Sequence, residues 1–216
     1  MAALSVSGLN LYSTRRYSTY STYSTIGTSS MADWKIPSLG YALLGLLQKP
    51  SSGYDLRKVF SSTSMKTYSD SPGAIYPALR RLEHRGLVRG TIEEGSGMRR
   101  RQVFHLTQKG LSELKKWITR PVGREDLVRG QQEIMLRFAF SETAVGPAAA
   151  TALAKSLGGA VEAYITQLHE ELNASKATMP TSARLAFEGG IRATECLQQW
   201  ARYVVTTYEQ ENKGGA

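Results

Sequence analysis

The stretch from Ser71 to Gly90, SPGAIYPALRRLEHRGLVRG, constrains the fold more than any other part of the chain. Serine suits the cap of a helix and proline suits its first position, which predicts a helix that begins near Ser71. Apolar side chains then recur at the spacing of one helix face, at Ile75, Leu79 and Leu82. Gly86 suits the position that ends a helix, and the residues after it are typical of a strand. The stretch therefore predicts a helix that turns directly into a strand.

The opposite face of this helix is polar and basic. It carries Tyr76, Arg80 and His84 at spacings of four, beside Gly73, Pro77 and Arg81. Pro77 has no backbone N–H, so we expect a kink there or regular bonding only beyond it. Cations gathered on one short helix are typical of a surface that meets a polyanion, although they also suit a merely solvated face.

The residues before this helix predict two more helices. Residues 38–48, SLGYALLGLLQ, are strongly apolar, with Pro37 at their start and Pro50 beyond their end. Ser52 and Asp55 then form the S-x-x-D pattern of a capping box and open a helix that runs past Phe60.

The residues after it predict a hairpin and a fourth helix. Residues 87–93 and 99–106 have the pattern of strands, joined by the glycine-containing loop EGSGM. Thr107 suits the cap of a helix that runs to Ile118. The order helix–helix–helix–strand–strand–helix predicts a winged helix-turn-helix, so the expected fold class is mainly α with a small β-hairpin wing.

The positive charge of the chain belongs to this winged-helix region. The net charge is +9, and residues 31–120 hold 16 Lys and Arg against 7 Asp and Glu, whereas residues 121–216 hold 9 against 11. A concentrated basic region favours a nucleic acid or an anionic membrane surface as partner, although a basic protein without such a partner stays possible.

Double-stranded DNA is the partner that suits this arrangement, because helix-turn-helix proteins place their recognition helix in the major groove. The third predicted helix would bring Tyr76, Arg80 and Arg81 there. The wing would bring Arg99, Arg100 and Arg101 to nearby phosphates or to the minor groove. Since side chains alternate along a strand, we expect Arg99 and Arg101 to share one side.

Three segments of the chain resemble the PadR family of transcriptional regulators. They are ALLGLLQKPSSGYDLRKVF, SPGAIYPALRRLEHRGLVRG and RRRQVFHLTQKGLSELKKW, in order and correctly spaced within residues 38–117. The resemblance implies a homodimeric bacterial regulator, usually a repressor, released from a palindromic operator by a phenolic acid or another small aromatic effector. It implies DNA contacts at these positions: Ser71, Ala74, Tyr76, Pro77, Arg80 and Arg99 to Arg101. Two positions depart from the family pattern, since Tyr68 replaces a common tryptophan and Phe104 a common tyrosine.

Residues 1–30 differ from the rest in composition. RRYSTYSTYSTIGTSS has a three-residue repeat, no acidic residue and no hydrophobic period. A twin-arginine signal would need an apolar region that is missing, and a transit peptide fits the composition but not the repeat. Met31 opens a more ordinary sequence. We therefore expect residues 1–30 to be a disordered tail or a mis-assigned start, and residues 31–120 to be the DNA-binding domain.

Residues 121–216 predict a helical region with another role. A linker at 119–126, TRPVGRED, is followed by helical patterns at 127–140, 148–173 and 181–210. The last two predict a helical hairpin, whose apolar surface exceeds what a small winged helix covers. We expect this region to hold a homodimer together and to take part in effector binding, with packing onto its own chain as the alternative.

The chain lacks the residue patterns of an enzyme, a metal site or a cofactor site. Its histidines, His84, His105 and His169, form no H-E-x-x-H motif, and GSG at 95–97 suits a turn better than a phosphate loop. Its one cysteine, Cys196, excludes an intrachain disulfide and fits a reducing cytoplasm, and its apolar flanks predict a core position. No apolar run approaches the roughly 18 residues of a spanning helix.

The sequence does not specify the effector site. Several aromatic residues could border a cavity between the two regions, although each also suits plain core: Trp34, Tyr41, Trp117, Phe138 and Trp200. Two other functions stay open. A winged helix used for protein contacts should lack the basic face described above, and an enzyme would be revealed by a bound metal or cofactor.

Overall fold

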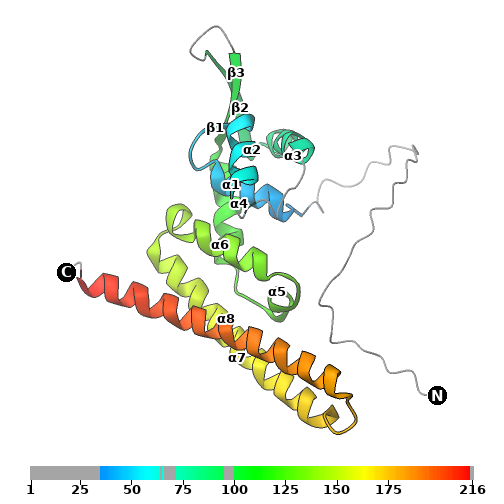
Figure 1. The fold of residues 1–216 in the computed structure, drawn as a ribbon. Helices are drawn as coiled ribbons and strands as arrows, with labels where there is room; N and C mark the ends of the chain where they lie inside the picture. The colour runs from blue at the N-terminus through cyan, green and yellow to red at the C-terminus, as the bar shows by residue number, and fades with distance from the viewer. Residues whose placement is uncertain (1–34, 64, 66–71, 95–99, 215–216) are drawn as a thin grey trace, which may run out of the picture.

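A computed structural model describes residues 35–63, 65, 72–94 and 100–214 of the chain. The winged helix forms one end of the molecule, a long helical hairpin forms the other, and shorter helices lie between them (Figure 1). In chain order the elements are α1 (Ser38–Leu46), β1 (Ser51–Ser52), α2 (Gly53–Ser62), α3 (Pro72–His84), β2 (Val88–Glu94), β3 (Arg100–Leu106), α4 (Gln108–Thr119), α5 (Arg124–Arg129), α6 (Gln131–Ala144), α7 (Pro147–Ser175) and α8 (Thr181–Gly214).

The sheet has one more strand than the sequence predicted. The order is β1-β3-β2, all antiparallel, with Ser51 opposite Phe104 and Ser52 opposite Val103. The β2–β3 hairpin runs from the pair Val88–Leu106 to the pair Glu94–Arg100. Strand β1 has only two residues, and it fixes the base of the wing to the start of α2.

The predicted helix ends are confirmed by their hydrogen bonds. Ser52 Oγ accepts a bond from the Asp55 N–H at 3.2 Å and donates to Asp55 Oδ2 at 2.7 Å, which caps α2. Thr107 Oγ1 accepts from the Gly110 N–H at 3.0 Å and caps α4. Gly86 has a φ of +69°, the left-handed conformation that ends α3 and turns the chain into β2. Helix α3 is continuous through Pro77.

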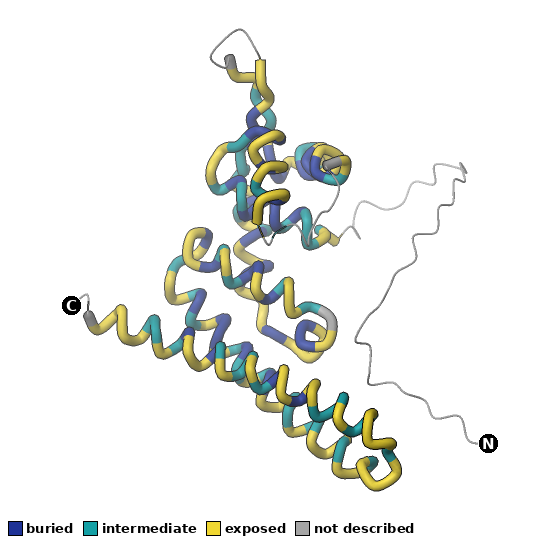
Figure 2. Tube along the Cα trace, in the orientation of Figure 1, coloured by how far each residue is buried: buried dark blue, intermediate teal, exposed yellow. Residues whose placement is uncertain are grey.

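The core of the winged helix extends into α6. It contains buried side chains of α1, α2, α3, β2, β3 and α4, together with Leu136 and Ala144 of α6. Phe140 of α6 packs so closely on α1 that a Cβ at Gly45 would overlap its ring. Figure 2 shows this as a band of buried residues that continues from the winged helix into α6. A helix beyond residue 120 therefore completes the core of the predicted DNA-binding region.

The linker predicted at 119–126 is wrong in its last residues, because α5 begins at Arg124. Asp126 is buried, and its carboxylate accepts bonds from the Gly123 N–H at 2.8 Å and from Arg120 Nη2 at 2.6 Å. These bonds are tertiary contacts, which a short segment without a hydrophobic period does not reveal in its sequence.

Helices α7 and α8 form the predicted hairpin, with 29 and 34 residues. A second core joins them to α5 and α6 through these buried side chains: Val122, Leu127, Ile134, Leu153, Leu157, Val161 and Ala201. Near its end α8 is hydrogen-bonded to α6, since Tyr208 Oη donates to Glu142 Oε2 at 2.7 Å. That bond favours the neutral phenol and raises the pKa of Tyr208 to about 12.

Much of the hairpin surface has no covering layer in the single chain. The prediction of a core position for Cys196 is wrong, because its side chain is exposed. It lies off the buried stripe of α8, which contains Ile191, Thr194, Ala201 and Val204. Leu185 and Tyr203 of the same helix are 54% and 68% exposed. Among the described residues, no helix is both long and apolar enough to cross a membrane.

Candidate nucleic-acid interface

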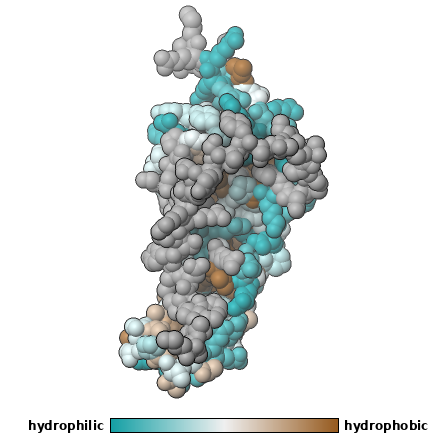
Figure 3. All heavy atoms as spheres, turned by 90° about the vertical axis from the view of Figure 1, so that its right-hand side faces the viewer, coloured by the Kyte–Doolittle hydropathy of each residue, from teal (hydrophilic) through white to brown (hydrophobic). Residues whose placement is uncertain are grey.

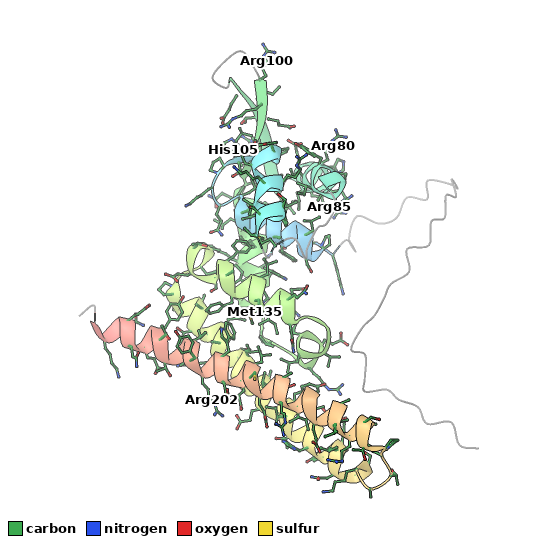
Figure 4. The ribbon with its side chains drawn as sticks, in the orientation of Figure 1. Arg80, Arg85, Arg100, His105, Met135 and Arg202 are labelled. Carbon is green, nitrogen blue, oxygen red and sulfur yellow. The ribbon has the colours of Figure 1, made fainter. Side chains whose placement is uncertain are left out.

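Helix α3 separates its apolar and basic residues as predicted. Ile75, Leu79 and Leu82 are buried in the core at 1% exposure or less. On the other side Pro77, Arg80 and Arg81 are exposed, Tyr76 is 46% exposed and Ala74 is half-buried. Ser71, also a candidate, lies outside the described residues. In Figure 4 Arg80 projects from α3 at the end of the molecule away from α7 and α8.

Tyr76 is positioned by Gly53, a glycine that was not among the residues selected from the sequence. Gly53, the first residue of α2, lies against the ring, and a Cβ at this position would come within 2.6 Å of Tyr76 Cε1. The ring therefore rests on the start of α2 and joins the exposed faces of α2 and α3. The signal in the sequence was the glycine of SSGYD, at a helix position where glycine is otherwise unfavourable.

The wing places Arg100 and Arg101 on successive residues of β3, opposite Glu94 and Glu93. Both arginines are exposed, and as neighbours on a strand they point to opposite faces. Arg101 Nη1 lies 4.0 Å from Asp55 Oδ2, with both side chains more than half exposed, so this ion pair is weak and a phosphate can replace it. Arg99 lies outside the described residues, so the expectation that it shares a side with Arg101 stays a prediction.

Further exposed cations, which no motif in the sequence marks, lie near α3 and the wing. They are Arg57 and Lys58 on α2 and Arg89 on β2. Arg57 is held over the ring of Tyr54, with its guanidinium carbon 5.7 Å from the ring centroid. Figure 3 shows mainly hydrophilic atoms on the described part of this end of the molecule. Exposed cations on α2, α3 and the wing suit a polyanion.

Arg101→Ala should weaken specific and random DNA about equally. If Arg101 contacts one phosphate, its loss should flatten the log–log dependence of the binding constant on salt by about 0.9. Fluorescence anisotropy with both DNAs at several salt concentrations measures this slope. Lys213→Ala, which removes the same charge from the end of α8 and lies outside residues 148–210, is the control and should keep the wild-type slope. An unchanged slope in Arg101→Ala would show that this residue meets no phosphate.

A second candidate site is a cavity of about 570 Å³ between the winged helix and α6. Its wall contains Tyr41 and Trp117, whose rings stack with centroids 4.2 Å apart and planes within 5°. Burial and the nearby carboxylates of Glu113 and Glu133 raise the pKa of Tyr41, so its phenol stays neutral. We call this the Tyr41–Trp117 cavity.

The five aromatic residues selected from the sequence do not share one cavity. Phe138 and Trp200 meet edge to face with centroids 4.9 Å apart and line a separate groove of about 420 Å³ on α6 and α8. Trp34 lies outside the described residues. In the part of the chain that the structure describes, no group of three His, Cys, Asp or Glu side chains is placed to hold a metal ion.

Sequence comparison with known proteins finds relatives that match the winged helix, and one that also matches much of the rest of the chain. The model of the transcriptional regulator PadR-like family matches residues 43–116. The negative transcriptional regulator PadR of Bacillus subtilis is 34% identical over 105 residues, which are 47% of this chain and 56% of that protein. The probable transcriptional regulator Rv1176c of Mycobacterium tuberculosis is 25% identical over 182 residues, which are 78% of this chain and 96% of that protein.

Two solved structures of Bacillus subtilis PadR also match. The complex with operator DNA has a TM-score of 0.38 and 22% identity, and covers 79% of this chain and 97% of that one. The complex with p-coumaric acid has a TM-score of 0.36 and 22% identity, and covers 82% of this chain and 99% of that one. These structural likenesses are low, so the relationship rests on the sequence matches.

Proposed function

Because the chain belongs to the PadR-like family of transcriptional regulators through its residues 43–116, we propose that it is a sequence-specific DNA-binding repressor. Its operator would be a palindrome, and a small aromatic acid would release it. A partner of this kind places the protein in the cytoplasm, with the chromosome.

One observation carries the proposal: α3 presents Tyr76 and Arg80 on an exposed face beside a wing that presents Arg100 and Arg101. An exposed helix flanked by a cationic hairpin suits the major groove and the phosphates beside it. The candidate contacts on this surface are Ala74, Tyr76, Pro77, Arg80, Arg81, Arg100 and Arg101, with Ser71 and Arg99 added from the sequence. Titration of the full chain with DNA from upstream of its own gene and with random DNA tests the proposal, which requires a clear preference for the upstream DNA.

The runner-up is a winged helix that contacts proteins. The cations gathered on α2, α3 and the wing argue against it, because a concentration of one sign of charge suits a polyanion such as DNA. A chain that binds upstream and random DNA equally weakly, yet forms a stable complex with another protein through α3, would favour this alternative.

A homodimer is part of the proposal, held mainly by residues 148–210. Leu185 and Tyr203 are exposed on α8, and a groove on α7 and α8 is lined in part by Gly158 and Gly159, which permit close approach of another helix. In sedimentation experiments the full chain should be dimeric at concentrations where a fragment of residues 31–146, which keeps α6 and lacks α7 and α8, is monomeric. Equal dimerisation of the fragment would place the interface within residues 31–146 instead.

The Tyr41–Trp117 cavity is the proposed effector site. Stacked rings suit an aromatic ligand, and the ammonium and guanidinium groups of Lys35, Lys109 and Arg120 in the wall suit its carboxylate. We expect Tyr41→Leu to weaken the binding of p-coumaric acid by about 3- to 10-fold, which corresponds to the loss of one aromatic contact.

Quenching of tryptophan fluorescence measures this affinity. Phe138→Leu, which removes an aromatic ring from the separate groove, is the control and should bind the acid as the wild type does. Binding that responds to changes at residues 71–101 and not to Tyr41→Leu would contradict the assignment.

A further inference from the structure

Helix α6 contacts both halves of the molecule with different residues. Leu136 and Ala144 are buried in the core of the winged helix, whereas Ile134 and Phe138 belong to the core of the α7–α8 hairpin. Figure 1 shows α6 as the element between the two halves. A shift of α6 against α4 therefore changes how α3 and the wing are held relative to the hairpin.

Glu133 on α6 makes the polar contacts across this junction. Its Oε1 accepts a bond from Trp117 Nε1 at 2.8 Å, and its Oε2 accepts one from Ser38 Oγ at 3.2 Å. Arg120 Nη2 lies 3.8 Å from Oε1. One carboxylate thus joins α6 to the start of α1 and to the last turns of α4.

These contacts are stronger than surface contacts of the same kind. The side chain of Glu133 is only 31% exposed, and hydrogen bonds to a charged acceptor are stronger than neutral ones. One turn further on, the guanidinium of Arg137 is fully buried and donates to Ile118 O at 3.1 Å, while Nε and Nη1 have no partner among the described residues. Burial lowers the pKa of Arg137, and Glu133 and Asp126 oppose that effect. The charge of Glu133 therefore also stabilises the buried cation.

Glu133 is at the same time part of the wall of the Tyr41–Trp117 cavity. Its hydrogen-bond donor Trp117 is one of the two stacked rings, and Arg120 is one of the cations of the wall. A carboxylate ligand stacked on these rings would compete with Glu133 for Trp117 Nε1, and the two anions would repel each other. Arg120, whose Nη2 donates to Asp126, would attract either anion.

We propose that Glu133 is the residue through which the cavity controls DNA binding. In the free protein it holds α6 against α1 and α4 in the arrangement that binds the operator. An aromatic carboxylate accepts the bond from Trp117 Nε1, displaces Glu133 and frees α6 to move. The inference rests on the proposed function and adds a positioning residue and a competition mechanism to it.

Three variants of the full chain test this mechanism. Glu133→Ala removes both acceptor oxygens and the charge. Glu133→Gln keeps one oxygen for Trp117 but loses the attraction to Arg120. Glu113→Ala is the control, because Glu113 lines the same cavity but accepts its hydrogen bond from Lys116 of its own helix.

We expect Glu133→Ala to bind upstream DNA about tenfold more weakly and p-coumaric acid about tenfold more tightly, because the ligand no longer competes with a charge-assisted bond. For Glu133→Gln, the affinities for upstream DNA and for p-coumaric acid should both lie between those of Glu133→Ala and the wild type. Glu113→Ala should bind the acid somewhat more tightly and upstream DNA as the wild type does. Structural damage alone would weaken both interactions together, so that outcome would overturn the proposal.

A third readout requires no DNA. The chain has three tryptophans, so a nitrogen–proton correlation spectrum contains three indole signals, and Trp117→Phe identifies one of them. The Trp117 signal should move in Glu133→Ala and on addition of p-coumaric acid, and should stay in place in Glu113→Ala. If the Trp117 signal keeps its position in Glu133→Ala or on addition of the acid, the mechanism is wrong. A wild type without preference for upstream DNA, with the signal moving as expected, would instead contradict the proposed function.

Discussion

Arg80→Ala is expected to reduce the preference for operator over random DNA by about 5- to 150-fold. The side chain is exposed one turn after Tyr76, on the face of α3 opposite the buried Ile75 and Leu79. From there the guanidinium can reach the edge of a guanine, and a bidentate contact of that kind contributes about 1–3 kcal/mol of discrimination. Affinity for random DNA should fall much less, because it depends on phosphates that other cations also contact.

Competition titrations with upstream and random DNA measure this ratio directly. Lys213→Ala again provides the control, since it removes one exposed positive charge from the end of α8 without changing α3 or residues 148–210. If Arg80→Ala keeps the operator preference while Arg101→Ala abolishes it, the wing and not α3 reads the sequence.

Gly110→Ala is expected to lower the free energy of unfolding by about 2–4 kcal/mol. Gly110 is buried in the first turn of α4, and a Cβ there would overlap the carbonyl oxygen of Leu87. That oxygen accepts bonds from the Thr107 N–H at 3.1 Å and from Thr107 Oγ1 at 3.0 Å. The expected loss of stability combines the overpacking of the new Cβ against Leu87 with the disturbance of these hydrogen bonds.

Thermal unfolding followed by circular dichroism measures the effect, and we expect the midpoint to fall by roughly 5–15 °C. Gly189→Ala is the matched control, because a Cβ at that helical position would meet nothing within 4 Å. It should be neutral or slightly stabilising, since alanine favours a helix over glycine. Similar losses in both variants would show that the contact with Leu87 does not limit stability.

The parts of the fold that the sequence predicted well depend on local chemistry. The caps at Ser52 and Thr107 and the left-handed turn at Gly86 need only a few neighbouring residues, and the structure contains all three. The spacing of Ile75, Leu79 and Leu82 predicts which face of α3 is buried. The same spacing therefore predicts that Tyr76 and Arg80, on the opposite face, are exposed.

The parts that the sequence did not predict depend on distant partners. Strand β1 has two residues and exists through its pairing with β3 about fifty residues later. Cys196 lies off the buried stripe of α8, and which face of a helix is buried depends on the helices that pack against it, chiefly α7 here. No sequence pattern singles out Glu133, because its hydrogen-bond donors Trp117 and Ser38 are distant in the sequence and only the fold brings them close.

Footprinting of the wild-type chain on the DNA upstream of its own gene tests the central claim most directly. A dimeric winged-helix repressor should protect two symmetric half-sites whose centres are a whole number of helical turns apart, about 10 base pairs or a multiple of that. Scrambling the bases of the half-sites at unchanged length should remove the protection. Uniform protection that survives scrambling, or no protection at concentrations that saturate random DNA, would contradict the account of α3 as a reader of sequence.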